Sequence, residues 1–357
     1  MIVLFSITKS LSRIRGHIFT LALLSLFPIS ANATPALVMD AQTLQVLHAE
    51  DAGHVWYPAS TTKLMTAFIV FESLRTGKVT METPVVLSAN AMNQEFVNAG
   101  LRVGSTMTLE DALFAMIAGS ANDVAVAVAE TIAGSESSFV GMMNDTATRL
   151  GMTASHFTNP NGLFDREHRS SARDLAILAA AVAREFPEHQ RFFKTSRVVI
   201  DGKSVDSYNE LLARYPGTVG MKTGFLCASG QNIVALAERE GRRILVVILG
   251  ATTGRERNER AAQFLTQAFA GELQPVGGTV LDLANDTSQQ PEDMRMKLCS
   301  NQTAAYESKR DALYPMGLPG HPSYLGPSGP IETHAITTWL TPLPGNIPIP
   351  TPRPANH

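Results

Sequence analysis

The stretch YPASTTKLMTAF, residues 57–68, places a serine and a lysine three positions apart at the start of a predicted helix. Residues three apart on a helix share a face, so Lys63 can reach Ser60 and accept its proton. The alternative is structural, because a serine at a helix start commonly caps the backbone amides of the first turn. A second Ser-x-x-Lys at residues 6–9 shows that this spacing alone is weak evidence. The rest of the chain must decide between the two interpretations.

The helix that begins near Ser60 opens a long helical middle of the chain. Residues 101–152 are typical of several alanine-rich helices in series, and residues 171–186 of one more. Strand-like runs flank this middle, with a hairpin over residues 36–51 and β-branched segments over residues 196–251. Strands from both ends around a helical middle indicate an α+β domain in which one sheet uses both ends of the chain.

Composition and length set the domain organisation. The chain has 357 residues, enough for one sizeable core and an appendage. We predict a domain over residues 34–270, followed by a Pro- and Gly-rich tail over residues 271–357 that is extended or disordered and partly docked. A formal net charge of −3 argues against nucleic-acid binding by phosphate neutralisation.

The first 33 residues have the parts of a secretory signal peptide. Lys9 and two arginines precede an apolar run over Ile18–Phe27, and Ala-Asn-Ala at residues 31–33 has the small-x-small form that signal peptidase cleaves. The apolar run is shorter than the ~20 residues that a membrane span needs, and no later segment reaches that length. We therefore predict cleavage near Ala33–Thr34 and a soluble protein in an exported compartment.

Two further motifs favour chemistry over capping at Ser60. Ser-x-Asn occurs at residues 88–90 and 120–122, and we favour the later copy because it lies in a loop between two predicted helices. The earlier copy is interpreted as a turn and a helix cap. Lys-Thr-Gly at residues 222–224 lies in a predicted strand. The similar Lys194–Ser196 is a weaker match, because serine cannot replace a glycine where substrate must approach the strand closely.

The order Ser-x-x-Lys, Ser-x-Asn, Lys-Thr-Gly resembles that of the low-molecular-mass penicillin-binding proteins, the serine D-alanyl-D-alanine carboxypeptidases. YPASTTKLMTA, SANDVAVAVAE, FTNPNGLFDREHRSSARDLA and GMKTGF all stand in the family's order, within roughly residues 35–270. The resemblance implies the penicillin-binding, β-lactamase-like transpeptidase fold, mainly an antiparallel sheet with helices on both faces and an all-helical subregion. It also implies a periplasmic enzyme that removes the terminal D-alanine from peptidoglycan stem peptides, needs no cofactor or metal, and is inhibited by β-lactams.

The resemblance further implies a role for each motif residue. Ser60 would be the nucleophile, Lys63 its base, and Ser120 the group that passes a proton to the leaving amine. Burial and the second ammonium of Lys222 would bring the Lys63 amine towards neutrality. The implied substrate-binding residues are Asn122, Lys222, Thr223, Gly224 and Phe225, with Arg257 as a further candidate for the terminal carboxylate.

Two departures from the family pattern leave alternatives open. An arginine that is common before the paired leucines is missing, with Tyr208 near its place, and the tail shows neither a β-rich second domain nor an amphipathic anchoring helix. We therefore expect no stable membrane anchor. The same centre could serve an endopeptidase that cuts crosslinks between stem peptides, or a β-lactamase using Asp165 or Glu167 to activate water. A catalytically silent wall-binding module is the third alternative, against which the intact Ser60 and Lys63 argue.

The two cysteines offer a further prediction. Cys227 follows the Lys-Thr-Gly strand and Cys299 lies in the tail. Because an exported compartment is oxidising, we predict a disulfide between them, which would hold the tail beside that strand. The alternative is two buried free thiols.

Overall fold

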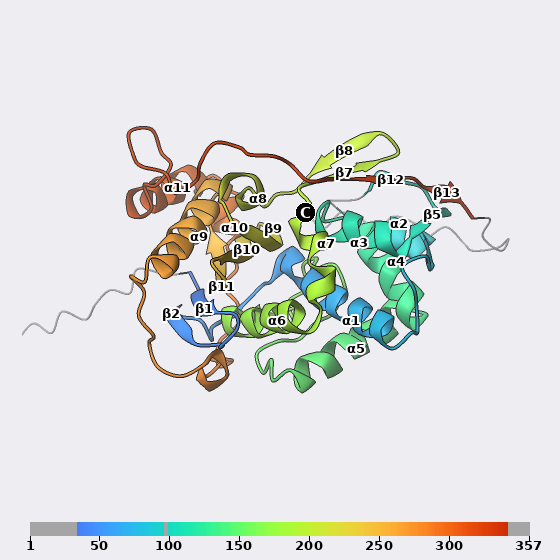
Figure 1. The fold of residues 1–357 in the computed structure, drawn as a ribbon, viewed down its shortest axis with the longest axis horizontal. Helices are drawn as coiled ribbons and strands as arrows, with labels where there is room; N and C mark the ends of the chain where they lie inside the picture. The colour runs from blue at the N-terminus through green and yellow to red at the C-terminus, as the bar shows by residue number, and fades with distance from the viewer. Residues whose placement is uncertain (1–33, 96–98, 342–357) are drawn as a thin grey trace, which may run out of the picture. The chain divides into compact units, whose positions relative to one another are not determined.

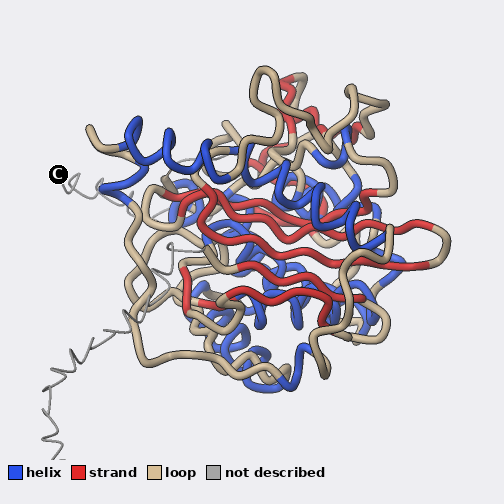
Figure 2. Tube along the Cα trace, turned by 90° about the vertical axis from the view of Figure 1, so that its left-hand side faces the viewer, coloured by secondary structure: helices blue, strands red, loops and turns tan. Residues whose placement is uncertain are grey.

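A computed structural model describes residues 34–95 and 99–341, so the predicted signal peptide lies outside the described residues. A five-stranded antiparallel sheet lies at the centre of this part, in the order β2-β1-β11-β10-β9 (Figures 1 and 2). Its strands are β1 (Ala36–Asp40), β2 (Val46–Glu50), β9 (Thr218–Leu226), β10 (Gly230–Arg239) and β11 (Arg242–Ala251). The N-terminal hairpin thus joins the strands that follow the helical middle, as the sequence predicted.

Both faces of this sheet are buried, because successive side chains enter two different cores. In β1, Leu37 and Met39 belong to one apolar cluster, whereas Ala36 and Val38 belong to the other. Helix α6 (Ala172–Glu185) contributes to the first cluster, and helix α9 (Gly254–Phe269) contributes to the second. This alternation of period two is what places helices on both sides of the sheet (Figure 2).

A helical region extends the first of these cores. Its helices are α1 (Lys63–Arg75), α2 (Ala89–Met92), α3 (Leu109–Ile117), α4 (Asn122–Ala133) and α5 (Glu136–Arg149). The short strands β4 (Pro84–Val86) and β5 (Ser105–Thr108) pair beside them. The hydroxyl of Thr108 accepts from the amide of Asp111 at 3.1 Å and caps the start of α3. Helix α4 is buried from its first residue, so Asn122 is fixed inside the protein.

Short elements connect the helical region to the sheet. They are β3 (Val55–Trp56), the 3-10 turn η1 (Ala59–Thr62), β6 (Ser170–Ser171), η2 (Pro187–His189), α7 (Arg191–Lys194), β7 (Arg197–Ile200), β8 (Lys203–Asp206) and α8 (Leu211–Arg214). Strand β7 packs against the turn after α3, because a Cβ at Gly119 would lie 3.2 Å from a methyl of Val198.

The segment after residue 270 returns across the domain and is partly regular. It contains η3 (Val280–Asp282), α10 (Arg295–Leu298), α11 (Thr303–Leu313), β12 (Thr333–Ile336) and β13 (Trp339–Leu340). Strand β12 pairs with β7 and strand β13 with β5 (Figure 1). The sequence did not predict α11, because this helix is polar and Arg310 is its one buried residue. The domain boundary near residue 270 stays a prediction.

Candidate active site

Ser60 lies in the 3-10 turn that leads into helix α1. Neither η1 nor α1 has a side-chain cap, so capping does not explain the serine. The Nζ atom of Lys63 instead lies 2.9 Å from the Ser60 Oγ atom. Ser60 and Lys63, three residues apart, lie on the same face of this turn, as the helical spacing predicted. The pair is therefore arranged for proton transfer between a hydroxyl and an amine.

Lys63 is fully buried, and its hydrogen-bond partners are uncharged. Besides Ser60, its Nζ atom contacts Asn122 Oδ1 at 2.7 Å and the carbonyl oxygen of Asn161 at 2.8 Å. Burial, and then the charge of Lys222, hold the pKa of Lys63 well below its ordinary value. Such an environment favours the neutral amine over the ammonium.

The second motif meets this pair from the turn between α3 and α4. Ser120 has a φ angle of 59°, a left-handed conformation that is uncommon for a serine and turns the chain sharply between the helices. Asn122 follows as the first residue of α4, with its Oδ1 on Lys63 and its Nδ2 donating to the carbonyl of Glu95 at 3.0 Å. The later Ser-x-Asn copy is thus the one that contacts Lys63.

The third motif lies on strand β9, at the edge of the central sheet. The Nζ atom of Lys222 donates to Ser120 Oγ at 3.0 Å, and burial, followed by the charge of Arg257, lowers the pKa of Lys222 to about 7. Thr223 is buried next to it. A Cβ at Gly224 would lie 2.8 Å from the amide nitrogen of Ser60, so only glycine lets the strand approach this serine.

Phe225 and Arg257 complete the predicted set in different ways. Phe225 follows Gly224 and is exposed on the edge strand. Arg257 lies in the first turn of α9, where burial lowers its pKa to about 10. Its guanidinium donates to Gln231 Oε1 at 2.9 Å and to the carbonyl of Tyr208 at 2.7 Å. Arg257 thus contacts Tyr208, the residue near the position where the family pattern has an arginine.

The sequence did not identify two residues that build this site. The carbonyl of Asn161 is a partner of Lys63, and a backbone group has no side-chain signature to search for. Asp123 is buried beside Asn122 and accepts from the amide of Ala99 at 2.8 Å and from that of Val124. Its charge opposes the lowering of the Lys63 pKa. The position of Asp123 directly after Ser-x-Asn was the available signal.

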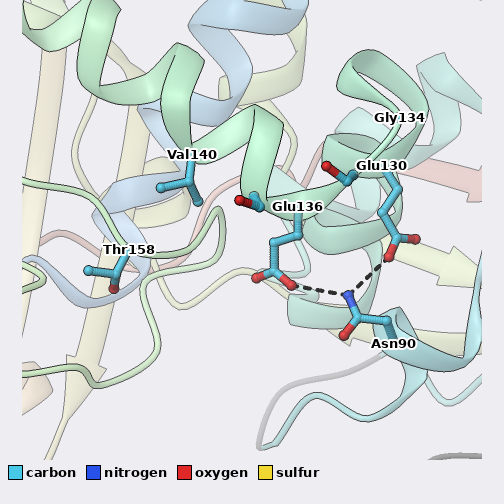
Figure 3. A pocket seen from close by; sticks show the side chains of 8 residues that line it. Asn90, Glu130, Gly134, Glu136, Val140 and Thr158 are labelled. Carbon is cyan, nitrogen blue, oxygen red and sulfur yellow. Dashed lines mark hydrogen bonds between the residues drawn. The ribbon is translucent and has the colours of Figure 1, made fainter.

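A separate pocket is lined by Asn90 of the other Ser-x-Asn copy, together with Glu130 and Glu136 (Figure 3). The Nδ2 atom of Asn90 donates to Glu130 and to Glu136, at 3.0 Å in each case. Ser88 accepts from the amide of Ala91 at 3.0 Å and begins α2. This copy therefore has the capping role that its position predicted. The remaining residues that line the pocket are Gly134, Ser135, Ser137, Val140 and Thr158.

The tail reaches the far end of the same edge strand. A disulfide joins Cys227, directly after β9, to Cys299, directly after α10.

Among the described residues, no group of three His, Cys, Asp or Glu side chains is arranged to hold a metal ion. The chemistry of the cluster rests on hydroxyl, amine and amide groups.

An α+β fold with a serine beside a buried lysine, a Ser-x-Asn turn and a Lys-Thr-Gly edge strand defines a serine acyl-transfer site of the penicillin-binding type. The chain belongs to the D-alanyl-D-alanine carboxypeptidase family, because the sequence model of that family, Peptidase_S11, matches residues 25–253.

Individual relatives agree with this assignment. The chain is 32% identical over 247 residues to the D-alanyl-D-alanine carboxypeptidase DacF of Bacillus subtilis, covering 68% of this chain and 63% of that protein. It is 33% identical over 249 residues to DacC of Escherichia coli, covering 67% and 62%. The match therefore spans less than two thirds of the length of these relatives.

Solved structures show the same fold. Penicillin binding protein 5 from Haemophilus influenzae matches with a TM-score of 0.64 at 30% identity, covering 67% of this chain and 71% of that one. Penicillin-Binding Protein D2 from Listeria monocytogenes, in its cefotaxime-bound form, matches with a TM-score of 0.59 at 26% identity, covering 66% and 97%. The predicted penicillin-binding fold is confirmed.

Proposed function

We propose that this chain is a serine-type D-alanyl-D-alanine carboxypeptidase that removes the terminal D-alanine from peptidoglycan stem peptides. One observation carries the proposal: Lys63 contacts both Ser60 and Asn122, while Lys222 contacts Ser120. Three motifs that are far apart in the sequence therefore share one hydrogen-bonded cluster. Membership of the family supports the substrate class.

The first half of the reaction forms an acyl-enzyme on Ser60. The Ser60 Oγ atom attacks the carbonyl carbon of the penultimate D-alanine, and its proton passes to the Lys63 amine. The C–N bond of the tetrahedral intermediate then breaks. The proton that Lys63 received is relayed through Ser120, which lies beside Lys222, to the departing amine, so Lys63 is neutral again and the products are free D-alanine and a serine ester.

The second half releases the shortened peptide. Water attacks the ester carbonyl and gives a proton to Lys63, and Lys63 passes that proton to Ser60 Oγ as the ester C–O bond breaks, which restores the hydroxyl and the neutral amine. The amides of Ser60 and Phe225 are proposed to stabilise the oxyanion in both halves, which the close approach of Gly224 to Ser60 supports. Removing one such donor typically costs about 3 kcal/mol of transition-state stabilisation.

Positive charge at one end of the cluster is proposed to bind the terminal carboxylate of the substrate. Lys222 and Thr223 supply an ammonium and a hydroxyl, and the Arg257 guanidinium adds to the positive potential that lowers the Lys222 pKa. The terminal residue of the substrate therefore lies on the Lys222 side of Ser60. The residues that precede the scissile bond lie on the other side, along Gly224 and Phe225.

The β-lactamase alternative lacks support in the loop that would provide its water-activating carboxylate. Asp165 and Glu167 are both exposed, and Glu167 pairs with Arg169 at 3.0 Å. Within the described residues, neither has a hydrogen bond to Ser60 or Lys63. The endopeptidase alternative would use the same cluster, so only products can separate it from the carboxypeptidase.

We also propose that the protein is exported and that β-lactams acylate Ser60. The signal-like residues 1–33 support export. None of the helices in the described part of the chain is long and apolar enough to cross a membrane. Penicillin-Binding Protein D2 from Listeria monocytogenes, which has the same fold, has been solved in cefotaxime- and ampicillin-bound forms, and this supports β-lactam binding here.

Labelled penicillin tests the nucleophile directly. We expect one label per protein on Ser60, and no label in Ser60→Ala or Lys63→Ala, because the first lacks the nucleophile and the second its base. Ser88→Ala is the matched control, since Ser88 belongs to the other Ser-x-Asn copy and should label like the wild type. Stoichiometric labelling of Ser60→Ala would contradict the proposal.

Product analysis tests the reaction. The purified protein should convert a pentapeptide stem into the tetrapeptide and free D-alanine, identified by mass. A crosslinked dimer of stem peptides should be cleaved more slowly. Preferential cleavage of the dimer would favour the endopeptidase.

A further inference from the structure

Residues 293–299 of the tail, which include α10, lie beside the C-terminal end of β9, the strand that carries Lys222, and we call them the wall. The wall lies outside the residues that match the family. Helix α10 is held there by the Cys227–Cys299 disulfide and by a hydrogen bond from the amide of Met294 to the carbonyl of Ala228 at 3.0 Å. Met294 is buried, with 1% of its surface exposed. The wall is therefore fixed to the end of β9 by a covalent bond, a hydrogen bond and apolar packing.

Arg295 presents its guanidinium from this wall to an aromatic pair. Its guanidinium carbon lies 3.9 Å from the centre of the Phe164 ring, and that ring lies 5.2 Å from the ring of Tyr57. The Arg295 side chain keeps 43% of its surface exposed and pairs with Asp293 at 2.5 Å. A guanidinium stacked by its face is held in place while its edge can still donate hydrogen bonds.

This arrangement lies on the side of Ser60 away from Lys222, because the chain before Ser60 runs along the end of β9. A Cβ at Gly224 would lie against Ser60 and Pro58, and the indole of Trp56 donates to the carbonyl of Ser229, beyond the end of the strand, at 2.8 Å. Tyr57 precedes Ser60 by three residues, and Phe164 follows Asn161, the carbonyl partner of Lys63, by three residues. Because the terminal carboxylate is assigned to Lys222, the peptide runs from there past Gly224 towards the end of β9. The scissile carbonyl lies beside Gly224, which approaches Ser60, and each residue of an extended peptide advances about 3.3 Å. The residue before the penultimate D-alanine therefore comes alongside Phe225 and Leu226, next to Cys227, to which α10 is attached.

We propose that Arg295, stacked on Phe164, forms a subsite for a carboxylate-bearing side chain of the residue that precedes the D-alanyl-D-alanine end of the substrate. The inference rests on the proposed function, because the direction of the peptide follows from the carboxylate assignment. It extends that function by giving the tail a part in substrate recognition.

The chemistry of the site favours a carboxylate over a cation. A guanidinium has five N–H donors, and its planar edge fits the two oxygens of a carboxylate. One donor, Nη1, is used by Asp293, and within the described residues Nε and Nη2 of Arg295 have no other hydrogen-bond partner. Arg166, which is exposed on the same loop as Phe164, adds a second positive charge, whereas Glu167 is paired with Arg169.

Two matched tripeptides, acetyl-Glu-D-Ala-D-Ala and acetyl-Gln-D-Ala-D-Ala, test this subsite in the full-length protein. They differ by one charge, and kcat/KM for D-alanine release is measured for each. In the wild type we expect the glutamate peptide to be preferred. Arg295→Ala should lower kcat/KM for the glutamate peptide about tenfold, the range of one charge-assisted hydrogen bond discounted for exposure, and change the glutamine peptide less than twofold.

Three further proteins make the result specific. Arg295→Lys keeps the charge without the planar fork and should lose most of the preference. Cys299→Ser frees α10 and should reduce the preference in the same direction as Arg295→Ala. Arg75→Ala is the matched control, because Arg75 also stacks on a phenylalanine, Phe186, at 4.7 Å from its guanidinium carbon, but from the last turn of α1. It should keep the wild-type preference.

The outcomes separate the subsite from the proposed function. An Arg295→Ala protein with the wild-type ratio between the two peptides, or with equal losses for both, overturns the subsite while leaving the carboxypeptidase proposal intact. A wild type that reacts with penicillin at Ser60 but hydrolyses neither these peptides nor the pentapeptide stem overturns the carboxypeptidase proposal, and the subsite with it.

Discussion

Lys63 is the residue on which the chemistry of this protein depends. An ammonium in the interior is strongly disfavoured unless a negative charge pairs with it, and its three hydrogen-bond partners are a hydroxyl, an amide oxygen and a backbone carbonyl. Lys222 adds like charge to the same interior. Loss of a proton frees a lone pair on Nζ, and the 2.9 Å contact to Ser60 directs that lone pair at the hydroxyl.

The pH dependence of acylation should report the protonation of Lys63. Only the neutral amine can accept the serine proton, so the rate of labelling by penicillin should be low in acid and rise as Lys63 loses its proton. Because burial and the Lys222 charge lower the pKa of Lys63, the midpoint of this rise should lie well below 10.5. Stopped-flow acylation rates across the pH range would measure it.

The second ammonium should be visible in the same profile. Lys222→Gln removes a like charge, so the Lys63 pKa should rise and the midpoint should move to higher pH. An unchanged midpoint would mean that burial alone sets the Lys63 pKa. The maximal rate is a separate readout, because Lys222 also contacts Ser120.

At the scale of elements, His168 fixes the loop that carries Asn161 to the start of α1. Its Nδ1 atom accepts from the amide of Thr158 at 3.1 Å, so the ring proton lies on Nε2 and is donated to the Thr62 hydroxyl at 2.8 Å. Burial, and then the charge of His156, lower the pKa of His168 to about 3. The neutral ring is therefore part of the folded structure.

His168 should make the protein less stable in mild acid. Between its ordinary pKa of 6.5 and its folded pKa of about 3, the unfolded chain binds a proton that the folded chain excludes. The free energy of unfolding should thus fall as pH drops through this window, by up to about 1.4 kcal/mol per pH unit from this residue. Urea unfolding at pH 7 and pH 5 should show a smaller difference for His168→Gln than for the wild type.

An exposed histidine provides the control for that measurement. His321 lies in the tail on the surface, so His321→Gln should keep the wild-type difference between the two pH values. Equal differences for His168→Gln and the wild type would show that His168 does not carry the acid sensitivity.

The elements that could be predicted from the sequence are those in which the pattern of apolar and β-branched residues reflects how the element itself is buried. The β-branched runs became β9, β10 and β11, and the choice between two Ser-x-Asn copies followed from their positions around helices. The carbonyl of Asn161 could not be predicted, because its position depends on the path of a loop. Helix α11 could not be predicted either, because its one buried residue, Arg310, is held by ion pairing and shows no apolar period.

At the scale of the whole molecule, the tail is attached to the domain by a buried ionic cluster in addition to the disulfide. Glu256 of α9 is fully buried and pairs with Arg310 from the tail and with Arg260. Both arginines also donate to the hydroxyl of Thr34. Burial alone would raise the pKa of Glu256, but the hydrogen bond and charge of Arg310 bring it below the ordinary value. The cluster thus ties Thr34, the first described residue, and helix α11 of the tail to α9.

Removal of the tail should therefore cost stability more than chemistry. A chain that ends at Gly271 loses Arg310, which leaves Glu256 with one arginine instead of two, and breaking such a buried pair typically costs about 3–5 kcal/mol. It also loses the Cys227–Cys299 bridge, a loop of 72 residues that is worth up to about 4 kcal/mol by the chain-entropy estimate. Because Ser60, Lys63 and Lys222 all precede the cut, penicillin labelling should persist at low temperature. Thermal unfolding with labelling at 10 °C would measure both effects.

Two single variants assign the loss to its causes. Cys299→Ser removes only the bridge, and Arg310→Met removes only the charge opposite Glu256 while keeping an apolar side chain of similar length. Each should lower the midpoint of thermal unfolding, and the truncated chain should lose more than either, because the bridge and the ionic cluster lie on different parts of the tail. A truncated chain as stable as the wild type would show that the docked tail does not stabilise the domain. In that case Arg310→Met should also leave the midpoint of thermal unfolding unchanged.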